Sequence, residues 1–210
     1  MFFKENDVVL FQGDSVTDCG RHRENLYDLG TGYPLIISSL LMHKLCGMNV
    51  RFINKGISGN RVCDLVERWQ EDCMDLKPTV VSILIGINDT WRNFDSNDET
   101  TTEAFEAGYR KILDDTKKLT DRIILMEPFV HPYPDDRKAW RADLDPKIQV
   151  VRKLAKEYGA ILVPTDGAVN AGFVAAPEKY YSEDGVHPTY AGHGLVAEAW
   201  CKAVGIELVK

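Results

Sequence analysis

The chain has 210 residues, of which 44% are hydrophobic, and its formal net charge is −7 at pH 7. A chain of this length can bury one substantial hydrophobic core, and its excess of acidic side chains repels nucleic-acid phosphates and anionic membranes. We therefore expect one domain over residues 1–210 that acts on a small molecule, with neither a nucleic-acid nor a membrane partner.

Two further features of the sequence bear on the cell compartment. The first ten residues, MFFKENDVVL, lack the basic and apolar regions of a secretory signal, and no run of about 18 apolar residues occurs. The five cysteines are odd in number and form no C-x-x-C pair, which argues against disulfides and a zinc cluster. We expect a cytoplasmic protein.

Five short apolar runs bounded by Gly, Pro or Asn predict buried strands. In chain order they cover residues 8–13, 50–54, 80–86, 122–128 and 160–165. Their hydrophobicity is continuous rather than alternating, which is typical of parallel strands that are covered on both faces.

Apolar residues at helical spacing separate these strands. The predicted helices cover residues 33–46, 62–76, 105–116 and 144–158, and a last helix follows Pro188. This alternation predicts an α/β fold, a three-layer α/β/α sandwich that is flavodoxin-like and has a central five-stranded parallel sheet. We expect the stretches 131–140 and 166–184 to be irregular.

Small polar residues follow four of the five strands, at the edge of the sheet where ligands bind in such folds. In chain order the segments are GDS (13–15), NKGISG (54–59), GIND (86–89) and, beyond a loop, DGVH (184–187). Each segment alone is typical of an ordinary turn. Together they would place a serine nucleophile, hydrogen-bond donors and a carboxylate-oriented imidazole at one point, which is the equipment of acyl transfer.

The ordered elements GDS, GxSG, GxND and DxxH resemble the GDSL or SGNH hydrolase family over nearly the whole chain. The flanking text TDCGR, LGTGY, NKGISGN, IGINDTWR and VHPTYAGH is similar to a narrower branch, the intracellular acetylxylan and carbohydrate acetylesterases. The resemblance implies Ser15 as the nucleophile, Gly59 and Asn88 as oxyanion-hole residues with the Ser15 backbone, and His187 with Asp184 as the remaining catalytic pair.

The chemistry of these residues agrees with those roles. His187 can accept the Ser15 proton because an imidazole has an ordinary pKa of about 6.5, and Asp184 can fix its tautomer. The backbone N–H groups of Ser15 and Gly59 and the side-chain amide of Asn88 would bind the oxyanion. Gly59 suits this because a residue without Cβ lets the backbone approach the substrate at positive φ.

Four other side chains are candidates for substrate binding. Trp91 and Arg92 follow the Asn88 segment and could line the acyl or sugar pocket. Arg61 could contact substrate hydroxyls, although an arginine that begins a helix is as often solvated or ion-paired. Tyr33 could shape the pocket or brace the turn after the nucleophile, and we expect Asp14 to hold that turn by local hydrogen bonds.

The other polar motifs predict no metal and no cofactor. His131 precedes a proline and is expected in a surface loop. His187 and His193 lack the i, i+4 spacing of zinc-binding helices. The Walker A and dinucleotide-binding glycine motifs of other α/β proteins are also missing from the sequence.

The favoured function is a serine esterase that removes short acyl groups, above all acetyl, from carbohydrates such as xylo-oligosaccharides, through an acyl-enzyme on Ser15. A lysophospholipase or acyl-thioesterase could use the same residues, because loops select the leaving group. An inactive carbohydrate-binding protein on the same fold is the alternative from another class. The sequence does not give the oligomeric state, but relatives of this branch often associate, with Trp140, Tyr180 and Tyr181 as candidate contacts between copies.

Overall fold

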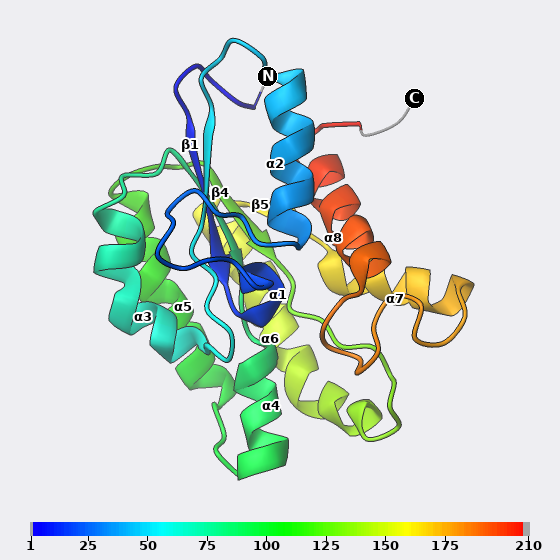
Figure 1. Cartoon of the computed structure of the whole chain (residues 1–210). Helices are drawn as coiled ribbons and strands as arrows, with labels where there is room; N and C mark the ends of the chain where they lie inside the picture. The colour runs from blue at the N-terminus through cyan, green and yellow to red at the C-terminus, as the bar shows by residue number, and fades with distance from the viewer. Residues whose placement is uncertain (1, 208–210) are drawn as a thin grey trace.

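A five-stranded sheet forms the centre of the structure, a computed structural model that describes residues 2–207. Its strands are β1 Val8–Gly13, β2 Arg51–Asn54, β3 Val80–Leu84, β4 Ile123–Met126 and β5 Ile161–Val163. They are parallel and lie in the order β2-β1-β3-β4-β5. Helices cover both faces of the sheet (Figure 1), which confirms the predicted three-layer α/β/α sandwich.

Five helices lie where the sequence predicts them. They are α2 Tyr33–Lys44, α3 Val62–Trp69, α5 Thr102–Lys117, α6 Arg137–Tyr158 and α8 Tyr190–Ala203. Three are predicted from the spacing of apolar residues and two, α2 and α8, from the residues at their ends. The end of the helix predicted over residues 62–76 is a π-helical turn, η1 Gln70–Met74. No helix among residues 2–207 is long and apolar enough to cross a membrane.

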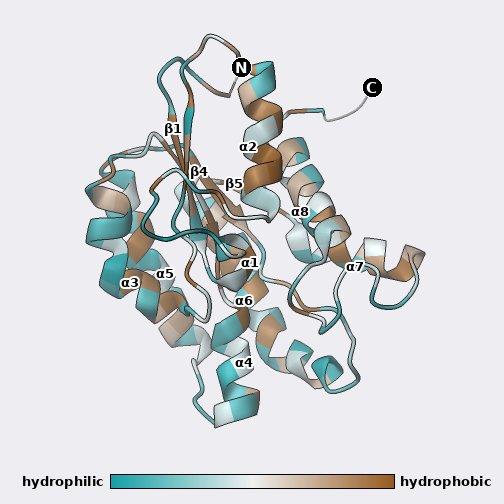
Figure 2. Ribbon diagram, in the orientation of Figure 1, coloured by the Kyte–Doolittle hydropathy of each residue, from teal (hydrophilic) through white to brown (hydrophobic). Residues whose placement is uncertain are grey.

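Side chains on the two faces of the sheet belong to two separate cores. Phe11 and Met126 pack with residues of α2 and α8 on one face. Leu10 and Leu125 point the other way and pack with residues of α3, α5 and α6. Figure 2 shows the strands in brown between the helix layers. Burial on both faces explains the continuous hydrophobicity of the strand sequences.

The two stretches expected to be irregular each contain helix. The first overlaps α6, which begins at Arg137 and continues through Pro146, although a proline lacks the N–H for a helix hydrogen bond. Most of α7, Thr165–Ala175, falls within the second stretch, and this helix packs against α8. Its sequence TDGAVNAGFVA is rich in small residues and shows no clear apolar stripe, so tertiary packing decides its conformation.

The order of the strands determines where a ligand site can form. The chain runs from β1 to β2 on one side of the sheet and then to β3 on the other side of β1, so the connections diverge at the carboxyl ends of β1 and β3. Helix α1, Ser15–Asp18, follows β1 directly, and α4, Ile87–Ser96, follows β3. Ser15 thus begins one helix, and Asn88 lies in the first turn of another, at the same crevice.

Candidate active site

Three side chains from two remote segments form one hydrogen-bonded chain. Ser15 Oγ lies 2.9 Å from His187 Nε2. On the other side of the imidazole, His187 Nδ1 lies 2.6 Å from Asp184 Oδ2. This arrangement brings together a hydroxyl, a base that can accept its proton and a carboxylate that orients the base.

The Asp184 carboxylate is also bound by its own segment of the chain. Its Oδ1 accepts hydrogen bonds from the backbone N–H groups of Val186 at 2.9 Å and His187 at 2.7 Å, and from the Ser182 hydroxyl at 3.3 Å. Burial opposes ionisation of Asp184, but the hydrogen bonds from His187 and Val186 outweigh burial and hold its pKa below the ordinary value. The hydrogen bond to Asp184 raises the pKa of His187, against the effect of burial.

A tight turn presents Ser15 at the end of β1. Asp14 caps α1, since its Oδ1 accepts a hydrogen bond from the N–H of Val16 at 3.0 Å, so the expected local role of Asp14 is confirmed. Residue 13 must be glycine, because a Cβ there would lie 2.3 Å from Thr17 Oγ1 and 2.4 Å from the Leu84 carbonyl oxygen. The turn that presents Ser15 is therefore packed tightly against the end of β3.

The predicted oxyanion-hole residues come from two other segments of the same crevice. Asn88 is 3% exposed, and its Nδ2 donates a hydrogen bond to the Asn60 carbonyl at 3.0 Å. A carboxamide has two N–H donors, so one remains for an oxyanion. Gly59 has φ of 86°, a value that an L side chain rarely adopts, so glycine is favoured by conformation.

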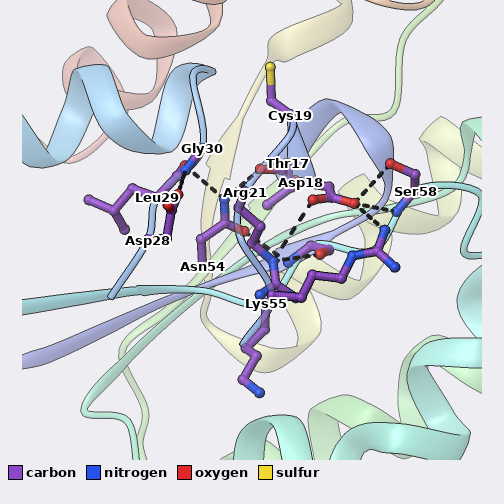
Figure 3. A network of polar contacts seen from close by, with 12 residues as sticks. Thr17, Asp18, Cys19, Arg21, Asp28, Leu29, Gly30, Asn54, Lys55 and Ser58 are labelled. Carbon is purple, nitrogen blue, oxygen red and sulfur yellow. Dashed lines mark hydrogen bonds and ion pairs between the residues drawn. The ribbon is translucent and has the colours of Figure 1, made fainter. Parts of the chain in front are cut away.

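Asp18 joins the loop that carries Gly59 to the turn that carries Ser15 (Figure 3). Its Oδ2 accepts the backbone N–H and the hydroxyl of Ser58, both at 2.9 Å, and Arg23 Nη2 at 2.5 Å. Burial opposes ionisation of Asp18, but these hydrogen bonds lower its pKa overall. We name this set the Asp18 clamp.

A second contact in Figure 3 fastens the same two segments. The Asn54 side chain at the end of β2 donates to the Thr17 carbonyl at 2.7 Å and to the Leu29 carbonyl at 3.0 Å. Its Oδ1 accepts the N–H of Gly56 at 2.9 Å. These buried bonds hold the strand-end loops of β1 and β2 at a fixed separation.

The candidates for substrate binding have different surroundings. The Trp91 ring centroid lies 5.8 Å from that of the His187 imidazole, so Trp91 borders this candidate catalytic group. Arg92 pairs with Asp95 at 2.8 Å, and Arg61 pairs with Asp98 at 3.0 Å. Both arginines are partly exposed and engaged by carboxylates, and substrate binding by these three residues stays a prediction.

The structure corrects the prediction for Tyr33. Its side chain is fully buried against Phe11, and its hydroxyl lies 2.9 Å from Thr17 Oγ1. A residue without exposed surface is not available to substrate. Tyr33 instead braces the helix that follows Ser15, the other role that the sequence allowed for it.

The sequence analysis placed neither of two residues that lie beside the Asp184 segment, Arg137 and His131, near the site. Arg137 Nε donates to the Asp184 carbonyl at 3.2 Å, and its guanidinium lies 4.0 Å from the Trp140 ring centroid. His131 is 1% exposed, and its backbone N–H donates to the Gly185 carbonyl at 2.9 Å. The surface prediction for His131 is wrong because the segment packs beneath the Asp184 loop.

Trp140 is also buried, at 2% exposure, so its predicted contact between copies is wrong. Its ring packs against Trp91 and Phe94. Trp140 therefore belongs to the wall behind Trp91. Trp140 lies near the His187 segment only because the chain folds that way, and no spacing in the sequence indicates it.

Two open pockets differ in their relation to these residues. One of about 470 Å³ is lined by His187, Tyr190, His193, Cys19 and Glu183, among others. A larger one of about 910 Å³ lies over α2 and α8, with none of the proposed catalytic residues in its lining. Within residues 2–207, no group of three or more His, Cys, Asp or Glu side chains is placed to hold a metal ion.

Comparison with known proteins identifies the family. Residues 11–195 match the GDSL-like Lipase/Acylhydrolase family. The chain belongs to this family. The acetylxylan esterase of Geobacillus stearothermophilus is 38% identical to this member of the family, over 97% of the present chain and 96% of the relative.

Solved structures give the same assignment. A variant of an acetyl xylan esterase from Geobacillus stearothermophilus is 37% identical to this GDSL-family chain, covers 100% of both chains and has a TM-score of 0.92. A Parabacteroides merdae protein described as a GDSL-like lipase is 38% identical, covers 98% of both chains and has a TM-score of 0.91. The chain is thus a carboxylic ester hydrolase of the GDSL type, a serine hydrolase.

Proposed function

We propose that this GDSL-family hydrolase removes short acyl groups, above all acetyl, from carbohydrates such as xylo-oligosaccharides. The observation that carries the mechanism is the 2.9 Å contact between Ser15 Oγ and His187 Nε2, with Asp184 on the opposite ring nitrogen. The acetylxylan esterase name of a relative that is 38% identical supports the carbohydrate substrate. Two structures of the Geobacillus esterase are described as catalytic mutants, one with a serine and one with a histidine replaced by alanine.

In the first half of the reaction, Ser15 Oγ attacks the ester carbonyl carbon while His187 Nε2 takes the hydroxyl proton. The carbonyl oxygen becomes an oxyanion, which the N–H groups of Ser15, Gly59 and Asn88 stabilise. His187 then gives its proton to the leaving alcohol as the ester C–O bond breaks, and the acyl group stays on Ser15. Asp184 stabilises the imidazolium between the two proton transfers.

The second half repeats these steps with water. His187 takes a proton from a water molecule, which attacks the acyl carbon of the acyl-enzyme, and the oxyanion forms again at the same donors. When this intermediate collapses, Ser15 Oγ regains its proton from His187 and the free acid leaves. One base and one oxyanion hole serve both halves, so the reaction requires no cofactor.

The extent of the hydrolase domain and its surroundings form a further part of this proposal. The family match over residues 11–195 supports one hydrolase domain over residues 1–210, of which Met1 and residues 208–210 lie outside the described residues. A cytoplasmic location stays a prediction, as does self-association through Tyr180 and Tyr181.

Ester hydrolysis by two variants tests the mechanism. We expect Ser15→Ala to lose roughly 10⁴-fold or more of the wild-type kcat on p-nitrophenyl acetate. Asn88→Ala should lose about 10²- to 10³-fold, the usual effect of removing one oxyanion donor. Thermal unfolding of both variants should match the wild type. Wild-type turnover no faster than that of Ser15→Ala would leave the inactive binding protein as the better explanation.

The acyl and alcohol parts of the substrate need separate assays. Wild-type rates on acetyl, butyryl and octanoyl esters of p-nitrophenol should decrease with chain length. Acetylated xylo-oligosaccharides should release acetate with a higher kcat/KM than lysophospholipids release fatty acid. The reverse order on either series would contradict the proposed substrate and favour the lipase-like alternative.

A further inference from the structure

The pocket of about 470 Å³ beside His187 has a lining that differs from the rest of the site. His187 forms one wall, Tyr190 and His193 come from α8, and Cys19 comes from the end of α1. Neither Gly59 nor Asn88 belongs to this lining. The pocket thus adjoins the base without adjoining the proposed oxyanion hole.

The direction of proton transfer indicates which part of the substrate lies next to this pocket. His187 Nε2 takes a proton from Ser15 and must hand it to the oxygen of the leaving alcohol, so that oxygen has to come within hydrogen-bond distance of Nε2. The carbonyl oxygen is held at the same time by Gly59 and Asn88. An ester attacked by Ser15 therefore directs its alcohol portion toward the open space beside the imidazole.

The floor of the pocket is uncharged. His193 Nδ1 accepts the backbone N–H of Tyr33 at 3.2 Å, so the ring proton of a neutral His193 resides on Nε2, which lies 3.3 Å from Cys19 Sγ. Burial lowers the pKa of His193 to about 4, and the ring is neutral at physiological pH.

The charge of the walls discriminates between leaving groups. The lining contains the carboxylates of Glu183 and Asp184 and no Lys or Arg. A phosphate headgroup entering here would meet like charge with no cation to bind it. A neutral polyol instead offers hydroxyl donors to the exposed Glu183 carboxylate.

Tyr190 gives the pocket an aromatic rim. It begins α8 immediately after the cap residue Thr189, and although it lines the pocket its side chain is 82% exposed. The face of a pyranose ring carries C–H groups that remove apolar surface from water when they stack on an aromatic ring. Tyr190 has the exposed surface that such contact requires.

We propose that this pocket is the subsite for the sugar leaving group and that Tyr190 is the platform on which the pyranose ring next to the scissile ester stacks. The inference rests on the proposed function and assigns a further binding residue to it. The subsite selects the alcohol portion of the ester, whereas the crevice around Gly59 and Asn88 binds the acyl portion.

Two acetate esters with different alcohol portions test the subsite. Acetylated xylobiose and ethyl acetate share the acyl group, but the ethyl group is too small to cover an aromatic ring. In Tyr190→Ala the ratio of kcat/KM for acetylated xylobiose to that for ethyl acetate should fall roughly 10-fold, mainly through KM for the sugar. Tyr190→Phe keeps the ring and should retain most of the wild-type ratio.

A tyrosine outside the pocket provides the matched control. Tyr27 lies between α1 and α2, is 57% exposed and is not part of the pocket lining. Tyr27→Ala should keep the wild-type ratio. Because both tyrosine side chains are largely exposed, Tyr190→Ala and Tyr27→Ala should also keep the wild-type unfolding temperature.

The outcomes separate the subsite from the proposed function. An unchanged ratio in Tyr190→Ala, or an equal loss on both esters, would overturn the subsite while leaving the esterase assignment intact. A wild-type enzyme that hydrolyses ethyl acetate but no acetylated sugar would instead overturn the carbohydrate substrate itself. A ratio that falls in Tyr190→Ala but stays near the wild-type value in Tyr190→Phe and Tyr27→Ala would support Tyr190 as the stacking platform.

Discussion

At the scale of single residues, His187 and Asp184 shift each other's pKa in opposite directions. Their 2.6 Å contact raises the pKa of His187 and contributes to lowering that of Asp184. Asp14, whose pKa burial raises to about 7, adds a further attraction for the protonated imidazole. His187, the proposed base, therefore stays protonated to a higher pH than an isolated histidine does.

The pH dependence of kcat/KM follows from this shift. The proposed mechanism needs neutral His187, so activity should fall as the pH drops through a midpoint above the ordinary value of 6.5. In Asp184→Asn the residual activity should have a lower midpoint, because the group that raises the pKa of His187 has lost its charge. A pH profile of p-nitrophenyl acetate hydrolysis measures both midpoints.

An exposed carboxylate serves as the control for that profile. Asp121 pairs with Lys117, has a side chain that is 85% exposed and lies just before β4, at the edge of the parallel sheet opposite to the candidate site. Asp121→Asn should keep the wild-type midpoint. If the midpoint of Asp184→Asn equals that of the wild type, the protonation seen in the profile belongs to another group.

At the scale of elements, the Asp18 clamp connects two loops that follow different strands. Ser58, which binds Asp18, directly precedes Gly59, and Asp18 ends the short helix that Ser15 begins. The position of the Gly59 N–H relative to Ser15 thus depends on a few hydrogen bonds between loops. Oxyanion donors stabilise a transition state only when they are already aimed, so a displacement of this loop should slow the chemical step.

Replacing Asp18 by Asn tests the clamp. The amide keeps the size of the side chain but loses the charge that binds both Ser58 donors and Arg23. We expect kcat to fall roughly 10-fold while KM changes little, since the contribution lost acts in the transition state. Steady-state kinetics with active-site titration measures the change for each folded molecule.

Arg23→Ala is the matched control for the clamp. The Arg23 side chain is 51% exposed, and an exposed ion pair contributes little to stability. This variant removes the Arg23 contact and leaves both bonds from Ser58, so its kcat should stay near the wild-type value. An Asp18→Asn enzyme with unchanged kcat and a lower unfolding temperature would limit Asp18 to a structural role.

The elements that the sequence predicts well are those with long, uniform patterns. The five strands are apolar throughout because both faces are buried, and α5 shows a regular stripe that includes Phe105 and Tyr109. Helix α1 has only four residues, too few for a periodic signal, whereas α4 has three apolar residues at helical spacing, Ile87, Trp91 and Phe94, within a largely polar sequence. The conformation of short elements at strand ends depends on the local turn and on contacts with neighbouring segments.

The site was predictable to the extent that its residues follow strands. The segments that contain Ser15, Gly59 and Asn88 were predictable from their positions after consecutive strands, since parallel strands bring their carboxyl ends to one edge. The resemblance to the GDSL family then pointed to these three residues within the segments. Arg137 and His131 lie near the Asp184 segment only through tertiary packing. Tyr33 was misplaced because a tyrosine near a motif gives no sign of whether its ring points inward.

At the scale of the whole molecule, buried carboxyl groups affect stability as well as the site. Asp89 is fully buried between α4 and α3, and both of its oxygens accept the N–H of Val62, at 3.3 and 3.2 Å. Burial raises its pKa to about 7. Ionisation of this group in the folded protein is therefore unfavourable compared with ionisation in the unfolded chain.

The pH dependence of unfolding should report this burial. The pKa of Asp89 is about 7 in the folded protein, compared with an ordinary value of 3.8 for an aspartate, so between these pH values the folded state binds more protons than the unfolded chain. Its contribution to stability is thus present below about pH 4 and is lost as the pH rises toward 7. The side chain in Asp89→Asn never ionises. The free energy of unfolding of this variant should therefore rise by roughly 1–3 kcal/mol relative to that of the wild type as the pH increases from 4 to 8.

Chemical denaturation at several pH values measures that gain. Asp95 lies on the same helix but is exposed, so the free energy of unfolding of Asp95→Asn should change with pH as that of the wild type does. A difference between Asp89→Asn and the wild type that stays constant with pH would show that Asp89 ionises equally readily in both states.

The bonds that Asp184 makes within residues 182–187 have a mechanical consequence. Carboxylate and imidazole are locked into one small rigid body, so any motion of that stretch carries both together and leaves their mutual proton affinity intact. What such motion alters is the gap between the imidazole and the hydroxyl across the crevice. Reactivity in this hydrolase then depends on the distance between these two segments, which a probe placed on each side of that gap could follow during turnover.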